Sequence, residues 1–364
     1  MKKKSPEECL DDMAFIRSVD TSRLFKLIDN FPEQIENAVN SFNFDTSKIG
    51  KIVEDSFSQV GIVGVGTAKV CAEVLKTLSD RMGIKPIFFI NEFSLPCWVD
   101  SKTLLFFVSF SGNTEEVISC FDQLVEHRCT SIVITSGGHL EQKALSIGVP
   151  IVKIKKEFPP NRTVFPYMIV PVILTLNVAG YLDVNGRDLI KVADFLKEKR
   201  ALFSINKKTS TNIAKQTALY LYNRIPLLYT DESLYSGVIL RWQYQLNENA
   251  KVLAHSARLP EMSHNEVVGL QGSGLSSISA PLFIFSEDKR EGACGRMAFT
   301  RSILEGSGYS IRFVGVPGKN DLEKIFCGIL MGDYVSFYLA IGRGVDPHAV
   351  DAIDSIRLQG NTKR

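Results

Sequence analysis

Two short segments in the second half of the chain carry side chains that could move protons. Residues 247–251 read Asn-Glu-Asn-Ala-Lys, and residues 262–266 read Met-Ser-His-Asn-Glu. Glu248 and His264 are therefore sixteen positions apart, each with asparagine beside it. A carboxylate base and an imidazole suit a reaction that moves a proton between neighbouring carbons and opens a sugar ring. Either residue alone is more simply a surface carboxylate or a backbone-bonded histidine, so the hypothesis depends on the two occurring together.

A third candidate is Arg162, in the segment Phe-Pro-Pro-Asn-Arg-Thr at 158–163. The prolines stiffen this loop, which follows a predicted strand. A guanidinium held there could stabilise the oxyanion that develops when a proton leaves carbon.

Residues 109–116, Ser-Phe-Ser-Gly-Asn-Thr-Glu-Glu, are predicted to hold a phosphate. Ser109 and Ser111 come at the end of an apolar run, and Thr114 lies in the first turn of the following helix. Free amides and the helix dipole favour an anion at such a turn. We expect Asn113 to cap this helix, with Glu116 completing a capping box. An ordinary capped turn would look similar, but the density of hydroxyls favours the phosphate.

A glycine loop at 64–69, Gly-Val-Gly-Thr-Ala-Lys, follows the first predicted strand. A dinucleotide site is a weak interpretation, since Lys69 stands where the third glycine would be. Contact of Gly66 and Thr67 with a sugar phosphate explains the loop at least as well. A glycine turn needed only for packing stays a third possibility.

Composition bounds the class of protein. The 364 residues predict two domains, with 45% hydrophobic and 23% charged residues as in ordinary globular proteins. A net charge of +2 gives no reason to expect nucleic acid or an acidic membrane as partner. The seven cysteines show no metal-ligand spacing, so we expect reduced, mostly buried thiols in a cytoplasmic protein and no metal. The start of the chain does not read as a signal peptide.

One segment, 165–182, is apolar enough to raise the question of a membrane span. Pro166, Pro171 and Asn177 interrupt it, and charged flanks suited to an anchor are missing. A helix buried between a sheet and a partner subunit is the better interpretation.

The order of predicted elements indicates an α/β protein. Residues 1–44 are predicted to be helical and amphipathic, and 45–200 to form a first domain with five parallel strands. Residues 201–364 repeat the theme, with a charge-rich surface helix at 188–208 joining the halves. Strands are expected at 60–65, 86–90, 103–110, 131–135, 150–154, 227–230, 281–285 and 311–316, and second-half helices at 234–249, 295–305 and 321–342. The second half has Glu287 and Asp288 where the first has its glycine and hydroxyls, so only the first should bind phosphate.

At these motifs the chain resembles the bifunctional phosphoglucose/phosphomannose isomerases, which are SIS-domain proteins of the phosphoglucose isomerase superfamily. The resemblance spans roughly residues 45–358. It is most specific at 109–116, at 245–251 (Gln-Leu-Asn-Glu-Asn-Ala-Lys), at 259–269 (Leu-Pro-Glu-Met-Ser-His-Asn-Glu-Val-Val-Gly), at 332–340 (Gly-Asp-Tyr-Val-Ser-Phe-Tyr-Leu-Ala) and at 343–347 (Arg-Gly-Val-Asp-Pro).

The resemblance implies two SIS-type domains, each a parallel sheet flanked by helices. It implies a cofactor-free aldose–ketose isomerase that acts on glucose 6-phosphate, mannose 6-phosphate and fructose 6-phosphate. Glu248 would be the base, His264 the ring-opening group and Arg162 the enediolate stabiliser. The family's histidine is lent by the other subunit, so a homodimer with shared active sites is implied. The resemblance assigns no role to residues 1–44, which we expect to pack against the partner.

Two positions depart from the family pattern. The early loop has Thr67-Ala68 where the family has a glycine and a serine, and Arg357 stands where the family has a lysine. Arginine keeps the charge but does not donate a proton at neutral pH, and Lys363 is a substitute if the tail folds back.

Two other classes of protein use related folds. One is a non-catalytic sugar-phosphate sensor. The presence of Glu248 and His264 argues against this class, as does the lack of an apparent DNA-binding domain. The other is the synthase half of a hexosamine amidotransferase. We expect this class to have a cysteine directly after Met1 and a glutaminase-sized region before the two domains, and the sequence has neither.

Overall fold

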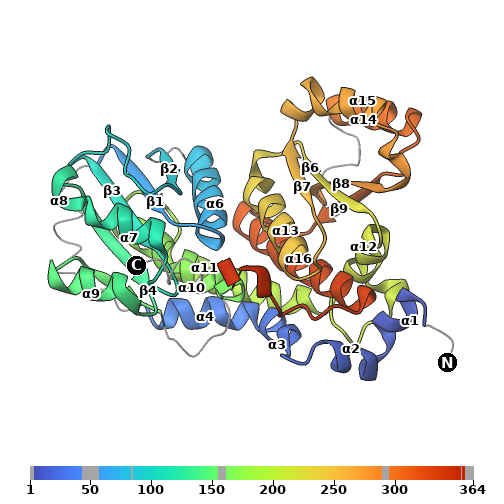
Figure 1. Cartoon of the computed structure of the whole chain (residues 1–364), viewed down its shortest axis with the longest axis horizontal. Helices are drawn as coiled ribbons and strands as arrows, with labels where there is room; N and C mark the ends of the chain where they lie inside the picture. The colour runs from blue at the N-terminus through green and yellow to red at the C-terminus, as the bar shows by residue number, and fades with distance from the viewer. Residues whose placement is uncertain are drawn as a thin grey trace.

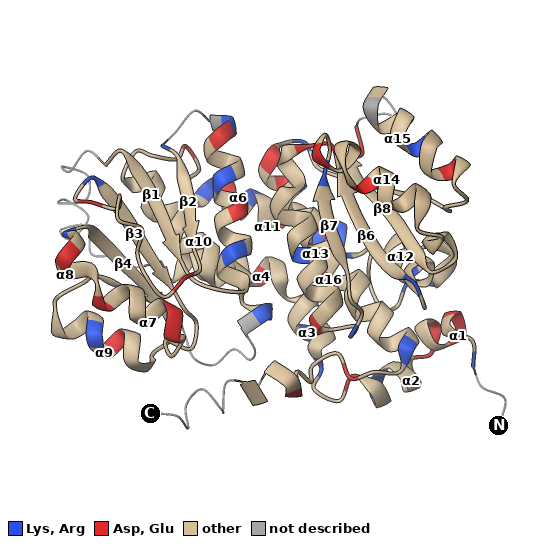
Figure 2. Ribbon diagram, turned by 45° about the horizontal axis from the view of Figure 1, so that its top comes forward, with Lys and Arg blue, Asp and Glu red and all other residues tan. Residues whose placement is uncertain are grey.

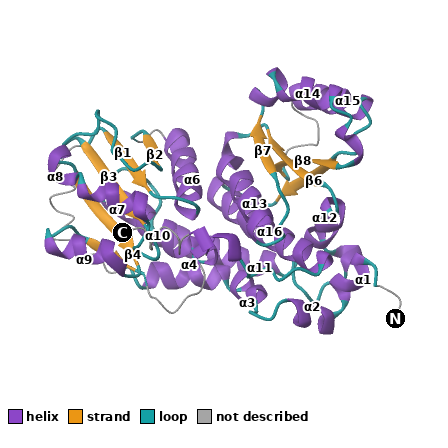
Figure 3. Cartoon of the chain, in the orientation of Figure 1, coloured by secondary structure: helices purple, strands orange, loops and turns teal. Residues whose placement is uncertain are grey.

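The computed structural model describes residues 4–42, 57–82, 85–154, 161–288, 295–353 and 355–356. It contains two parallel β-sheets, each with helices on both faces (Figure 1, Figure 3). This architecture confirms the predicted α/β class with two sheet-based halves.

The first sheet has the strand order β2-β1-β3-β4-β5, with every pair parallel. Its strands are β1 (Gln59–Val63), β2 (Ile87–Ile90), β3 (Thr103–Val108), β4 (Thr130–Thr135) and β5 (Ile151–Lys153). The central strand β3 is buried along its whole length. Leu104 and Phe106 enter one core and Leu105 and Phe107 the other, because successive side chains of a strand point to opposite faces.

Different helices cover the two faces of this sheet. One core includes α6 (Thr67–Met82) and α10 (Phe165–Val178), and the other includes α7 (Glu115–Asp122), α8 (Leu124–His127) and α9 (Gly138–Ser146). The predicted strands and the alternation with helices are confirmed.

The second sheet has the order β7-β6-β8-β9, again all parallel. Its strands are β6 (Ile225–Thr230), β7 (His255–Arg258), β8 (Ser279–Ser286) and β9 (Arg312–Val316). On one face lie α12 (Ile213–Leu221), α13 (Ser236–Glu248) and α16 (Asp321–Arg343), and on the other lie α14 (Glu266–Gly272) and α15 (Gly295–Gly306). The edge strand β7 was not expected, because it is short and its residues are mostly polar.

The longest helix, α16, forms the centre of the second half. It is long and apolar enough to cross a membrane, but 94% of its most apolar window is buried inside the protein, where it packs against α12 and α13. The apolar helix α10 is also buried, against α4 (Phe31–Asn40) and α6. We expected a partner subunit to cover α10. This is wrong where α4 and α6 of the same chain cover the helix.

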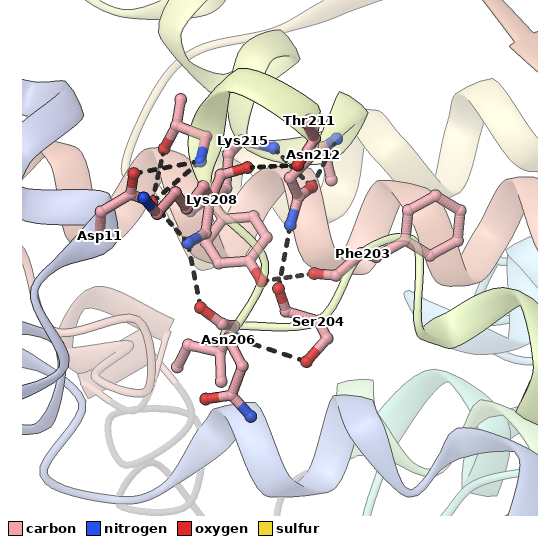
Figure 4. Close-up of polar contacts among 12 residues, drawn as sticks. Asp11, Phe203, Ser204, Asn206, Lys208, Thr211, Asn212 and Lys215 are labelled. Carbon is pink, nitrogen blue, oxygen red and sulfur yellow. Dashed lines mark hydrogen bonds and ion pairs between the residues drawn. The ribbon is translucent and has the colours of Figure 1, made fainter.

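The N-terminal helices α1 (Pro6–Asp11), α2 (Met13–Val19), α3 (Leu24–Asp29) and α4 belong to the same body. They pack on α10, α11 (Gly186–Arg200) and α16 of their own chain, so no partner is needed to explain their burial. Lys215 on α12 is fully buried and donates to Asp11 at 2.9 Å and to the Ile205 carbonyl at 3.0 Å (Figure 4). This ion pair fastens α1 to the second half of the chain.

The surface helix predicted at 188–208 differs from the helix in the structure. The observed helix α11 spans Gly186–Arg200 and buries Leu189, Val192 and Leu196 against α4 and α16. Its charged residues lie on the outer face of an amphipathic helix, which explains why the composition alone indicated a surface helix.

The described cysteines are free thiols, as expected. Four are buried, Cys129 is partly buried and Cys97 is exposed, while Cys294 lies outside the described residues. The buried thiols are Cys9, Cys71, Cys120 and Cys327.

Two helices join the halves in an antiparallel arrangement. Thr77 on α6 donates to the Ser233 carbonyl just before α13, at 3.3 Å. One turn nearer the start of α6, Val74 lies so close to Gly237 that a Cβ there would meet its side chain at 2.6 Å. Because the residue numbers run in opposite directions, the first turn of α6 lies toward the last turn of α13.

Candidate active site at the junction of the two sheets

The strand order of the first sheet reverses between β1 and β3, because β2 lies on one side of β1 and the later strands lie on the other. Ligands of open α/β sheets bind beyond the carboxyl ends of the strands at such a switch point. The loops that follow β1 and β3 are the two segments predicted to hold a phosphate, so the topology places them side by side.

The loop after β3 presents its hydroxyls in a connected set. The Ser109 and Thr114 hydroxyl oxygens are 2.7 Å apart, and Ser109 also accepts from the Gly112 amide at 3.1 Å. Ser111 is exposed and accepts from the Asn113 amide at 3.3 Å. These contacts hold three hydroxyl groups in the loop after β3, beside the switch point of the sheet.

The predicted capping of α7 is wrong. Thr114 is the N-cap, with extended backbone, and it makes no side-chain bond to the first turn of α7. Asn113 instead accepts from the His139 amide of α9 at 3.0 Å. The asparagine thus joins two neighbouring strand-to-helix loops, and the first-turn amides of α7 are not satisfied by their own cap.

Gly112 is needed for this close approach. Its φ is 66°, and a Cβ at this position would lie 1.7 Å from the Gly137 carbonyl oxygen. Gly137 and Gly138 open α9, a contribution that was not predicted, although paired glycines after a strand could have indicated it.

In the loop after β1, Gly66 has a φ of 58° and open space around its α-carbon. Thr67 is half-buried and begins α6, while Ala68 is fully buried. Gly64 packs tightly on Ala68, since a Cβ at Gly64 would lie 2.4 Å from the alanine Cβ. The hydroxyl of this loop therefore comes from Thr67, and Ala68 belongs to the core.

The structure brings Glu248 and Arg162 together. Glu248 is the last residue of α13, with its side chain 28% exposed, and Arg162 is buried in the 3-10 turn Asn161–Thr163. Arg162 Nη1 lies 3.8 Å from Glu248 Oε2. Its Nη2 donates to the main-chain carbonyls of Pro347, at 3.0 Å, and His348. A guanidinium held in this way presents a fixed positive charge beside the carboxylate.

A buried ion pair stabilises the 3-10 turn that carries Arg162. Arg241 on α13 binds both carboxylate oxygens of Asp333 on α16, at 3.0 and 2.9 Å, and donates to the main-chain carbonyl of Arg162. Gln245 also donates to Asp333, at 3.0 Å. Burial raises the pKa of the nearby Cys71 thiol on α6, and the Arg241 guanidinium partly opposes that rise.

Neither residue of this pair was predicted to have a role. Arg241 and Asp333 are charged residues inside largely apolar helices, and that was the available signal.

His264 lies elsewhere in the chain. It ends the 3-10 turn Glu261–His264, directly before α14. The helix α14 lies on the face of the second sheet opposite α13 (Figure 1). The imidazole is exposed and makes no hydrogen bond or ion pair with the part of the chain that the structure describes. A single chain thus does not bring His264 to Glu248. Arg357 and Lys363 lie outside the described residues.

The switch point of the second sheet is acidic instead of hydroxyl-lined. Ser286 at the end of β8 donates to Glu232 through its amide, at 2.9 Å, and through its hydroxyl, at 3.0 Å. Asp288 pairs with Lys324 at 2.9 Å. A phosphate would meet carboxylates at this position, in keeping with the prediction that only the first half binds one. Elsewhere, acidic and basic residues are interspersed over the helices (Figure 2).

Comparisons with known proteins show the family to which the chain belongs. Residues 210–359 match the bacterial phospho-glucose isomerase C-terminal SIS domain. The chain is 32% identical over 326 residues to the bifunctional phosphoglucose/phosphomannose isomerase of Aquifex aeolicus, covering 89% of this chain and 96% of that one. It is 30% identical over 300 residues to the D-glucosamine-6-phosphate 4-epimerase of Sulfolobus acidocaldarius, covering 82% and 88%.

Among solved structures, the fold is similar to a glucose-6-phosphate isomerase like protein from Thermus thermophilus. The TM-score is 0.62 at 18% identity, with 96% of this chain and 98% of that chain covered. Identity over nearly the full length of the Aquifex enzyme shows the family. The chain belongs to the family of bifunctional phosphoglucose/phosphomannose isomerases.

Proposed function

We propose that this protein is an aldose–ketose isomerase that interconverts glucose 6-phosphate, and also mannose 6-phosphate, with fructose 6-phosphate. The observation that carries the proposal is the pairing of Glu248 with Arg162 at the end of α13. Antiparallel packing brings the phosphate loop at the start of α6 toward the same end. An anion site and a carboxylate–guanidinium pair then serve one substrate.

The chemistry needs only proton movements. Glu248 takes the proton from C2 of the open-chain aldose and returns it to C1, while the C2 hydroxyl loses a proton and the C1 carbonyl oxygen gains one. C1 gains the reducing equivalent that C2 loses, so atoms and electrons balance without a cofactor. Arg162 stabilises the enediolate because its guanidinium is fixed beside the base.

The substrate phosphate is proposed to bind Ser109, Ser111 and Thr114, with the Gly66–Thr67 turn completing the site. Anions are favoured at helix N-termini, and both α6 and α7 begin at this point. Arg357 is proposed to contribute positive charge to the same site.

Ring opening is proposed to use His264 of the partner subunit in a homodimer. In support, His264 is exposed and lies on a face that carries exposed apolar side chains. Val268 on α14 and Phe299 on α15 are 69% and 71% exposed there. Such a set of apolar residues on one face is typical of a subunit interface.

The domain division at 1–44, 45–200 and 201–364 is also proposed, supported by the position of each sheet within one range. We also propose a cytoplasmic location, which the free thiols among the described residues support. No observation favours a non-catalytic sensor.

The test supplies the purified protein, without added metal, with glucose 6-phosphate, mannose 6-phosphate and glucosamine 6-phosphate in separate assays. Formation of fructose 6-phosphate from the first two is expected. A folded protein that binds these sugars without converting them would favour a sensor. Conversion of glucosamine 6-phosphate to its C4 epimer alone would favour the epimerase activity named for the Sulfolobus relative.

A further inference from the structure

Lys251 occupies a backbone position where a lysine is unusual. The helix α13 ends with a seven-residue turn, 246–252, in which the Val252 amide bonds to the Leu246 carbonyl at 3.2 Å. Lys251, just before it, has a φ of 54° in the left-handed region. Glycine is favoured at this point of such a turn because a side chain there is strained by roughly 1 kcal/mol. A lysine at this position indicates that its side chain has a use.

The amine of Lys251 bonds to three main-chain carbonyls. It donates to Glu248 at 2.8 Å and to Asn249 at 3.2 Å, both at the end of α13. These carbonyls lack helical partners, and a positive charge at the helix C-terminus is favourable. The third bond, at 2.7 Å, goes to Asp346 in the segment that follows α16.

The same segment receives Arg162. Its guanidinium donates to Pro347 and His348, so two cations hold three successive carbonyls, those of residues 346–348. The contacts form a closed circuit from Glu248 through Lys251 and residues 346–348 to Arg162, and from Arg162 back to Glu248 at 3.8 Å. Lys251 is therefore one link of the circuit that holds the guanidinium beside the base.

We propose that Lys251 is a positioning residue, which fixes the spacing between Glu248 and Arg162 by tying the end of α13 to the segment at 346–348. The proposal rests on the isomerase function, in which Glu248 and Arg162 act on the substrate. Lys251 itself is not required to touch the substrate, because its three N–H groups are all used on main-chain oxygens.

The electrostatic environment of Lys251 gives this tie a pH dependence. Burial, together with the Arg162 guanidinium, lowers the pKa of the amine to about 8, while Asp346, Asp351 and Glu248 oppose the shift. Above that pH the amine loses one donor and its charge, so one of the three carbonyls loses its partner. Activity should accordingly decline on the alkaline side.

The test compares Lys251→Met and Lys251→Arg with the parent protein. Lys199→Met is the matched control, since Lys199 pairs with Glu198 on α11 and makes no contact with the active site. We expect Lys251→Met to lower kcat between about tenfold and a hundredfold with little change in KM, as misplaced catalytic groups do. Lys251→Arg should restore part of kcat and remove the alkaline decline, because arginine stays charged.

Amide hydrogen exchange gives a readout that does not depend on activity. In Lys251→Met, the amides of residues 345–350 should exchange faster than in the parent, whereas Lys199→Met should leave them unchanged. Parental kcat, pH profile and exchange in Lys251→Met would overturn the proposal. If the parent itself is folded but does not isomerise sugar phosphates, the proposed function fails, and the exchange result alone then decides whether Lys251 forms the tie.

Discussion

Glu248 Oε2 and Arg162 Nη1 lie 3.8 Å apart although 86 residues separate them in sequence, and the two reach this position by different routes. Glu248 is placed by the end of α13, while Arg162 is held by the carbonyls of residues 347–348 and by Arg241. The pair is therefore a product of tertiary packing between the two halves of the chain.

The arginine is expected to act through its geometry as well as its charge. Arg162→Lys keeps the charge but cannot span both carbonyls and the carboxylate. We expect kcat to fall by about a hundredfold or more, with a smaller change in KM, because loss of one transition-state donor has that effect. Steady-state kinetics check this, and a lysine variant with parental kcat would show that charge alone suffices.

The hydroxyl pair of Ser109 and Thr114 is expected to bind the substrate phosphate. Ser109→Ala and Thr114→Ala should each raise KM by roughly tenfold, the effect of losing a hydrogen bond to a charged group, with kcat less affected. Ser119→Ala on the same helix α7, where the hydroxyl donates to the Phe93 carbonyl, is the control. An equal rise in KM in all three variants would argue against a phosphate site at this loop.

Removal of one partner of the buried pair Arg241–Asp333 is expected to destabilise the folded protein strongly. Asp333→Asn leaves a buried guanidinium without its counter-charge and should lower the free energy of unfolding by about 3–5 kcal/mol. Asp80→Asn, which breaks the exposed pair with Lys76, should change it by less than about 1 kcal/mol. Urea unfolding measures both, and similar values for the two variants would contradict the assignment.

The glycine at 112 is expected to be irreplaceable. Gly112→Ala places a methyl group against the Gly137 carbonyl in addition to the unfavourable φ, and it should reduce both stability and phosphate affinity. Gly66→Ala meets only the backbone strain, of about 1 kcal/mol, because a Cβ added at Gly66 would meet no described atom within 4 Å. Thermal unfolding of the two variants distinguishes these costs, and equal melting temperatures would mean that the loops at 112 and 137 do not pack as described.

Much of the fold could be predicted from local sequence. The strands of the first sheet are short β-branched runs between turn residues, and α13, α15 and α16 were placed within a few residues of their bounds. Residues 255–258 were missed because an edge strand of His-Ser-Ala-Arg has no apolar pattern, and its pairing with β6 depends on residues far away in sequence.

The residues of the proposed site could be named from the sequence, but the contacts that hold them in place could not. Glu248, Arg162 and the 109–114 loop could be named because each has a local motif. The tie from Lys251 to Asp346 and the pair of Arg241 with Asp333 join residues 95 and 92 positions apart, so no local pattern announces them. Asn113 was misassigned as a cap since its side chain bonds to a helix in the next strand-to-helix unit, which spacing alone does not reveal.

The central claim is that Glu248 carries the proton between C2 and C1, and isotope exchange tests it most directly. Parent protein and Glu248→Gln are incubated with fructose 6-phosphate in deuterium oxide, and deuterium at C2 of the aldose product is followed by NMR. We expect incorporation by the parent and a rate at least about a hundredfold lower in Glu248→Gln, since a neutral amide cannot accept the proton. Incorporation at the parental rate in a folded Glu248→Gln protein would contradict the account.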